Sequence, residues 1–344
     1  MGWWRLESAI CRNTRRLITI VKTTEFFPWA KPASVLGYGT TSFMSAPSTQ
    51  ERIGLLEAAF DAGITHFDTA AYYGYGEAER LVGTCFSGRR DKVTITTKFG
   101  IEPTGAAKYR WVNLAARRIF SFAPAVKKLF RRTGTAGSSW GVFDPARAEA
   151  SLDRSLAALR TDYVDLFLMH EPSPGSASSE PLLEFLDKEM VRGRIRGYGC
   201  GGEWESIRQI AASGGRSSKW LQFEDNALNR RIEEVKLCGA KCITFAPFNS
   251  ALQSLVYFLE RNPGRRDEWS KALDLDCRDR DCLASLLQAS CHARNPSGIV
   301  LFSSKSVERI RKAVCISDGK SFSDEQVSRF LELTLEVAPA TGPS

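Results

Sequence analysis

Short runs rich in β-branched and aromatic residues alternate with segments of helical hydrophobic spacing along this chain of 344 residues, and no other feature limits the possible folds as strongly. The expected strands cover 34–38, 64–68, 93–97, 163–169, 194–198, 218–223, 241–245 and 298–302. The expected helices cover 49–62, 77–86, 145–159, 180–191, 204–213, 230–238, 277–292 and 306–314. Strands that alternate with helices are typical of a parallel sheet. Eight such units predict a single-domain α/β fold, the closed (β/α)8 TIM barrel.

A doubly wound open sheet is the alternative architecture for this pattern. It would place a glycine-rich phosphate-binding turn after an early strand, and the sequence has no such fingerprint there. We therefore expect an N-terminal extension at 1–33, the barrel at 34–320 and a C-terminal tail at 321–344. Two long connections, 101–143 and 251–275, interrupt the repeat. The first leaves the carboxyl end of the third strand, which is the active-site face of such barrels.

The insertion at 101–143 contains eight basic residues, a number equal to the formal net charge of +8. After Pro103 it has no Asp or Glu, and its basic residues are Lys108, Arg110, Arg117, Arg118, Lys127, Lys128, Arg131 and Arg132. We expect a lid that attracts an anionic or amphipathic substrate, with Trp111 and Phe120 as candidate substrate contacts. The first alternative is a solvated helical pair packed on the barrel. The second, which we do not favour, is contact of 104–132 with a membrane surface or a partner helix.

Composition excludes several other classes of protein. The chain is 43% hydrophobic and 25% charged, which is ordinary for a globular protein. Because the positive charge is local, we expect no nucleic-acid partner. The nine cysteines and three histidines lack metal-ligand spacing, so we expect reduced thiols and no metal. No apolar run approaches the about 20 residues of a membrane span, and the start lacks a secretory hydrophobic segment, so we expect a cytoplasmic protein.

Four side chains of complementary chemistry lie at or just after the ends of expected strands. Asp68 ends the second strand, Tyr73 follows it, Lys98 ends the third and His170 ends the fourth. In a barrel these ends converge on one rim. A nearby ammonium lowers the pKa of a phenol and makes it a better proton donor at neutral pH. Asp68 would hold Lys98 charged and His170 would orient a carbonyl oxygen, so the set suits protonation of that oxygen as hydride arrives.

At these positions the chain resembles the aldo-keto reductase family. The resemblance rests on 68–77 with Gly83, on 97–100, on 151–170 and on 193–199, and it covers roughly 34–315. It implies an NADPH-dependent oxidoreductase that reduces an aldehyde or ketone, and a sugar and an anionic carbonyl compound are among the candidate substrates. Tyr73 would be the general acid, Lys98 its pKa partner, Asp68 the ion-pair partner of the lysine, and His170 the substrate-orienting residue. Tyr72 is a further candidate substrate contact.

The resemblance also assigns candidate cofactor contacts. Gly201 and Gly202 occupy the positions where the family usually has Ser and Asn to hydrogen-bond the nicotinamide carboxamide, and Gln222 matches the remaining contact. Phe245 matches the ring that stacks on the nicotinamide, and Pro247 and Phe248 continue its loop. The residues expected at the adenosine 2′-phosphate are Ser303, Ser304, Lys305 and Arg309. We therefore expect NADPH and no metal.

The glycine pair motivates an alternative function. Loss of two side-chain contacts at Gly201 and Gly202 would suit a nucleotide-binding regulatory or sensing protein on the same barrel with little turnover. The partner in either case is a small molecule, a carbonyl compound or an alcohol, and the direction of the reaction is open. The pattern does not indicate an oligomeric state.

Overall fold

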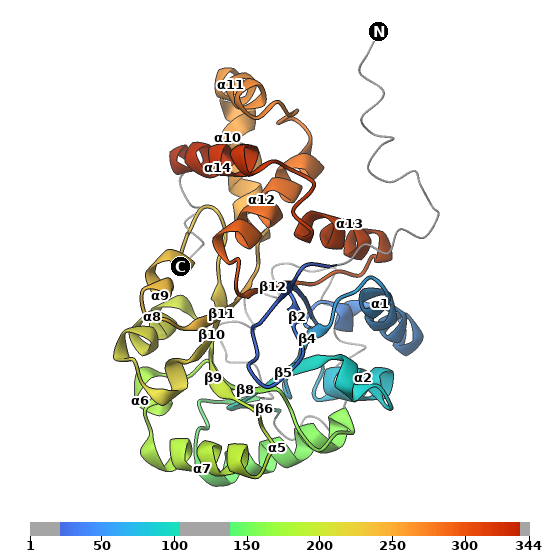
Figure 1. Cartoon of the computed structure of the whole chain (residues 1–344), viewed down its shortest axis with the longest axis vertical. Coiled ribbons are helices and arrows are strands. Elements are labelled where there is room, and N and C mark those ends of the chain that lie inside the picture. Colours follow the sequence, from blue (N-terminus) through green and yellow to red (C-terminus); the bar gives the residue numbers. More distant parts are fainter. Residues whose placement is uncertain (1–20, 104–137, 338–344) are drawn as a thin grey trace.

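Eight parallel strands close into a barrel in the computed structural model, which describes residues 21–103 and 138–337 (Figure 1). Each strand pairs with its neighbour in chain order, and the last pairs with the first. The barrel strands are β3 (Leu36–Gly39), β4 (His66–Asp68), β5 (Thr94–Phe99), β8 (Leu166–His170), β9 (Tyr198–Gly201), β10 (Trp220–Glu224), β11 (Lys241–Phe245) and β12 (Ile299–Phe302). The predicted (β/α)8 barrel is confirmed.

The helices that follow the strands form the outer layer of the barrel (Figure 1). Three of these helices begin at an N-cap residue: the side chains of Ser48, Asp144 and Ser306 each accept a hydrogen bond from a backbone N–H of the first turn. The outer helices are α1 (Thr49–Asp61), α2 (Glu77–Phe86), α5 (Pro145–Leu159), α6 (Pro174–Ala177), α7 (Glu180–Val191), α8 (Trp204–Ser213), α9 (Ile232–Lys236), α12 (Arg280–Arg294) and α13 (Val307–Ser317).

The fifth strand starts later than the sequence predicts. Ile195 forms only an isolated bridge with Val164, and regular pairing begins at Tyr198. A Cβ atom on Gly197 would lie 2.6 Å from the Trp29 ring, so an N-terminal aromatic side chain packs against the start of this strand. The start of this strand therefore packs on a residue distant in sequence, a contact that local periodicity does not report.

Part of the segment expected as an N-terminal extension closes the amino-terminal end of the barrel. β1 (Thr23–Thr24) and β2 (Ala33–Ser34) form an antiparallel hairpin, and Phe26 and Phe27 between them are fully buried. The Phe27 ring lies 5.7 Å from that of His66, and Lys241 Nζ donates to the Phe26 carbonyl oxygen at 2.7 Å. His66 and Lys241 begin their strands, so the hairpin leaves the carboxyl ends as the open face.

Two segments without expected helices form helices beside α12. The connection at 251–275 contains α10 (Asn249–Arg261) and α11 (Pro263–Leu273), and the segment expected as a C-terminal tail contains α14 (Asp324–Leu333). Trp269 and Phe330 are fully buried and their rings lie 6.3 Å apart. These helices form a second hydrophobic cluster at one side of the barrel (Figure 1).

The base of the basic insertion is a short hairpin. β6 (Ile101–Pro103) pairs antiparallel with β7 (Ser138–Trp140), and Glu102 forms ion pairs with Arg147 and Arg154 of α5. Trp111, Phe120 and the segment 104–132 lie outside the described residues, as does the remainder of the predicted lid up to 137. No helix within 21–103 or 138–337 combines the length and the apolar character needed to cross a membrane.

We predict that Phe330→Ala destabilises the protein by about 3–5 kcal/mol, because it opens a cavity in the second cluster between α14 and Trp269. Urea unfolding measures the effect. Ser328→Ala, on the exposed side of the same helix, is the control and should stay within about 0.5 kcal/mol. A loss below about 1 kcal/mol for Phe330→Ala would contradict a structural role for α14.

Candidate active site

A buried ion pair lies at the carboxyl ends of the barrel strands. Lys98 Nζ on β5 donates to Asp68 Oδ1 on β4 at 2.6 Å and to the Thr69 carbonyl oxygen at 3.0 Å. Gln222 Nε2 on β10 donates to Asp68 Oδ2 at 2.7 Å. Lys98 and Asp68 are each 3% exposed. Such burial is tolerated because both carboxylate oxygens and the ammonium have partners.

The Asp68–Gln222 bond spans the barrel rather than joining neighbours. Three strands, β11, β12 and β3, separate β10 from β4 in the closed sheet. The two side chains therefore meet across the mouth, above the interior packing. This bond couples the position of the ion pair to the opposite wall of the barrel.

Tyr73 and His170 flank the ammonium. The Tyr73 ring centroid lies 5.1 Å from Lys98 Nζ, and the Tyr73 and His170 rings lie 5.9 Å apart in an edge-to-face arrangement. The loop after β4 is held by hydrogen bonds from Thr69 N to Thr96 O and from Tyr73 N to Ala70 O. The structure thus brings together all four side chains that the sequence singled out.

The electrostatics of this group assign a charge state to two of its members. Burial lowers the pKa of the Lys98 ammonium, but Asp68 and Tyr73 raise it further, so the net shift is upward and Lys98 stays cationic. Burial, and then the charge of Lys98, lower the pKa of His170 to about 3. His170 is therefore a neutral imidazole at physiological pH, with one N–H donor and one acceptor.

The expected nicotinamide contacts lie on the same rim. Gln222 is in register with Gly201 on one side and with Ile243 on the other, and Phe245 ends β11 two residues later. The Gly202 N–H donates to the Gln222 carbonyl oxygen at 3.0 Å. Pro247 is buried, while the half-buried Phe248 ring packs on Phe302 at 6.3 Å. Phe248 therefore serves the packing of α10 on the barrel.

Glu171 belongs to this rim and was not among the residues that the sequence singled out. It follows His170 directly, and its carboxylate Oε2 accepts the Glu203 N–H at 2.7 Å. A Cβ atom on Gly202 would lie only 2.7 Å from that oxygen. Adjacency to His170 was the one available signal in the sequence, and it does not report the contact with Gly202.

The residues expected at the phosphate form the loop from β12 to α13. Ser303 Oγ donates to the Gly39 carbonyl oxygen at 2.7 Å, and the Ser304 carbonyl oxygen accepts the Tyr38 hydroxyl at 2.6 Å. Lys305 and Arg309 are exposed at the start of α13. A helix start with two cations suits a bound phosphate.

Tyr72 is half-buried beside Tyr73, with its ring 6.3 Å from that of Tyr75. The described residues contain no group of three or more His, Cys, Asp or Glu that could hold a metal ion.

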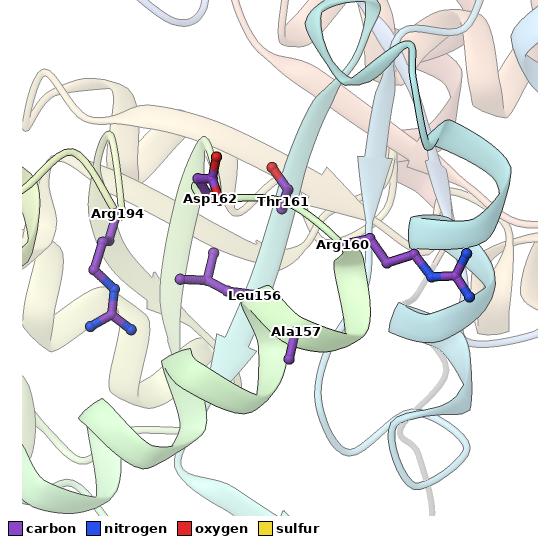
Figure 2. A pocket seen from close by; sticks show the side chains of 6 residues that line it. All are labelled: Leu156, Ala157, Arg160, Thr161, Asp162 and Arg194. Carbon is purple, nitrogen blue, oxygen red and sulfur yellow. The ribbon is translucent and has the colours of Figure 1, made fainter.

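A surface hollow elsewhere on the protein does not belong to this site. Its lining residues are Leu156, Ala157, Arg160, Thr161, Asp162 and Arg194. They lie at the end of α5 and in the loops that lead into β8 and β9, opposite the strand ends that carry His170 and Gly201. Figure 2 shows the guanidinium groups of Arg160 and Arg194 pointing away from each other, so they do not converge on one ligand.

Comparison with known proteins gives one family. The model of the aldo/keto reductase family matches residues 35–333. Aldo-keto reductase YhdN of Bacillus subtilis (strain 168) is 30% identical over 219 residues, which cover 61% of this chain and 55% of that protein. D-threo-aldose 1-dehydrogenase of a Pseudomonas species is 29% identical over 175 residues, 48% of this chain and 49% of that protein. The chain thus spans about half the length of these curated relatives.

Solved structures share the fold. The holo form of an aldo-keto reductase from Bacillus halodurans aligns with a TM-score of 0.67 at 19% identity and covers 90% of this chain and 96% of its own. An aldo-keto reductase from Klebsiella pneumoniae in complex with NADPH aligns with a TM-score of 0.63 at 19% identity, covering 94% and 98%.

We predict that Lys98→Met destabilises the protein by about 3–5 kcal/mol, because it leaves the Asp68 carboxylate buried without its cation. Asp68→Asn should cost a similar amount. The double variant should lose less than the sum of the single losses, since no lone charge is left behind. Urea unfolding of the four proteins measures the coupling, with exposed Lys92→Met as a control within about 0.5 kcal/mol. Additive losses would contradict the pairing.

We also predict that no histidine of the folded protein titrates between pH 5.5 and 8. Burial is the first cause that lowers the pKa of His66 and His170 to about 3 and that of His292 to about 4. These are the three histidines of the chain. NMR of 13C-labelled histidine measures the ring resonances. The urea-unfolded chain should titrate near about pH 6.5 as the reference, and a folded-state inflection above pH 5.5 would contradict the prediction for that residue.

Proposed function

The chain belongs to the aldo/keto reductase family, and on this premise we propose that it is an NADPH-dependent oxidoreductase that reduces an aldehyde or ketone to the alcohol. The observation that carries the proposal is the buried Lys98–Asp68 pair beside Tyr73 and a neutral His170, at the carboxyl ends of the strands. Barrel enzymes carry their chemistry at this face.

In the proposed reaction Tyr73 donates its phenolic proton to the carbonyl oxygen of the substrate. The developing phenolate is stabilised by the Lys98 ammonium, whose nitrogen lies 5.1 Å from the ring centroid. Asp68 keeps the ammonium charged and fixed, and Gln222 holds the second Asp68 oxygen. In the reverse direction the phenolate accepts the proton of an alcohol, so the same group serves oxidation.

His170 has a different role in this proposal. Because its imidazole is neutral, its single N–H can donate a hydrogen bond to the carbonyl oxygen without competing with Tyr73 for proton transfer. The edge-to-face contact with the Tyr73 ring keeps both groups on one side of the mouth. His170 would thus position the carbonyl oxygen beside the phenol.

The residues of the rim fit NADPH, which when bound supplies the hydride. Gly201 and Gly202 contribute no side chain beside Gln222, and Phe245 would stack on the nicotinamide. Ser303 and Ser304, with the exposed cations of Lys305 and Arg309, would hold the 2′-phosphate at the start of α13. The aldo-keto reductase from Klebsiella pneumoniae was solved in complex with NADPH, which supports NADPH as the cofactor.

The substrate in this proposal is a small carbonyl compound. The insertion at 101–143 follows β5, the strand of Lys98, in the chain. Its basic composition favours an anionic substrate. The alternative function, nucleotide sensing with little turnover, is favoured by the absence of side chains at Gly201 and Gly202.

We predict that Tyr73→Phe lowers kcat/KM for carbonyl reduction by about 100-fold or more, because it removes the proton donor and leaves the cofactor contacts intact. Wild type and variant are assayed by NADPH oxidation against aldehydes, ketones and sugars, including anionic ones. Their NADPH dissociation constants should agree within about twofold.

Tyr75→Phe, in the same loop, is the control and should keep most of the activity. Titration of the wild type with NADPH and NADH should show tighter binding of NADPH, because Lys305 and Arg309 meet the extra phosphate. Tight NADPH binding without turnover of any carbonyl would favour the sensing function, and equal rates for wild type and Tyr73→Phe would overturn the assignment of Tyr73.

A further inference from the structure

Glu171 adopts a backbone conformation that a non-glycine residue adopts at some cost. Its φ angle is +57°, in the left-handed region, directly after β8. The Glu171 N–H donates to the Gly201 carbonyl oxygen at 2.8 Å, which continues the β8–β9 pairing past His170. Non-glycine residues in this region concentrate at binding and catalytic sites, where the surroundings hold them in place. The turn directs the Glu171 side chain over the end of β9.

The carboxylate of Glu171 occupies the space beside Gly202. A Cβ atom on Gly202 would lie 2.7 Å from Glu171 Oε2 and 3.0 Å from Glu171 Cα. A side chain at position 202 and the Glu171 carboxylate in this position therefore exclude each other. The glycine at position 202, where the family usually has Asn, and the placement of the Glu171 carboxylate are therefore linked by the same steric contact.

Two acceptor oxygens at this point of the rim have no donor among the described residues. Glu171 Oε2 accepts the Glu203 N–H at 2.7 Å, and the Gln222 amide must face Asp68 with its nitrogen, since a carboxylate only accepts. Across 21–103 and 138–337, neither Glu171 Oε1 nor Gln222 Oε1 accepts a hydrogen bond. Gln222 Oε1 lies 3.1 Å from the position of a Cβ on Gly201, and the Glu171 carboxyl carbon Cδ lies 3.2 Å from that of a Cβ on Gly202, so the two acceptor groups border the same glycine pair.

Glu171 is half-buried next to His170, one of the proposed reacting residues. Burial raises the pKa of Glu171, and the Glu203 N–H and the Lys98 ammonium offset only part of this upward shift. Glu171 directly follows His170 at the end of β8, so it lies on the same rim as that imidazole.

We propose that Glu171 supplies the nicotinamide carboxamide contact that positions 201 and 202 lack, by accepting one carboxamide N–H while Gln222 Oε1 accepts the other. This inference rests on the proposed function, because it takes the rim beside Gly201 and Gly202 as the nicotinamide subsite. A carboxamide NH2 group has two donors, and the two acceptors bordering one glycine pair match them. A hydrogen bond to a charged acceptor contributes more than one between neutral groups.

The experiment compares two cofactors on wild type and Glu171→Ala. One is NADPH, and the other is its reduced 3-acetylpyridine analogue, which has a methyl ketone in place of the carboxamide and so lacks the N–H donors. Calorimetry gives the dissociation constants, and circular dichroism checks the fold. Glu171→Ala should weaken NADPH binding by about tenfold or more and change analogue binding by less than about twofold.

Equal weakening for both cofactors would overturn the proposal, since a merely relaxed loop cannot distinguish them. No effect on NADPH would overturn it as well. Failure of the wild type to bind NADPH at all would instead overturn the proposed function, so the two failures are distinguishable. Glu184→Ala, an exposed carboxylate on α7, is the matched control and should leave both constants unchanged.

A compensating pair tests the steric part of the proposal. Gly202→Asn alone should lose NADPH affinity, because the new side chain meets the Glu171 carboxylate. Glu171→Ala combined with Gly202→Asn should bind NADPH more tightly than either single variant, since the amide at 202 then enters the vacated space. A double variant no better than the weaker single variant would overturn the mutual exclusion.

Discussion

A lysine ammonium that is 3% exposed needs a partner for its charge, and the site is organised around how Lys98 obtains one. Asp68 supplies the countercharge from the adjacent strand β4, and the Thr69 carbonyl oxygen accepts a second hydrogen bond from the Lys98 ammonium. Gln222, from the opposite wall, satisfies the remaining carboxylate oxygen. Closure of the barrel brings Gln222 to the ion pair, whereas Asp68 and Lys98 come from neighbouring strands. The charge of Lys98 in this pair then affects the electrostatic potential at the neighbouring residues.

That field reaches the other titratable groups of the barrel interior and mouth. The charge of Lys98 adds to burial in lowering the pKa of His66 and His170, and it opposes burial at Glu171. One cation thus adds to burial in keeping the His170 imidazole neutral, faces the Tyr73 ring and partly offsets the upward pKa shift of Glu171. The neutral imidazole is what the proposed orientation of the substrate requires.

The strand positions could be predicted from the sequence because buried strands are read from local composition. The expected strand at 241–245 has the bounds that the structure shows, and Asp68, Lys98 and His170 lie at strand ends as expected. The prediction was wrong for the start of the fifth strand, where Trp29 packs on Gly197 from a segment expected to lie outside the barrel. Helix α14 was missed for a similar reason, since Phe330 is buried by Trp269, a partner 61 residues earlier in the chain.

The sequence by itself determined the barrel and the side chains that end its strands, because both follow from periodicity over a few residues. The tertiary structure alone decided which of these side chains meet. The Asp68–Gln222 bond joins residues 154 positions apart across the barrel mouth, and the exclusion between Glu171 and Gly202 depends on a left-handed turn and the register of two strands. No local pattern reports such contacts, because closing the sheet is what brings non-neighbouring strands together.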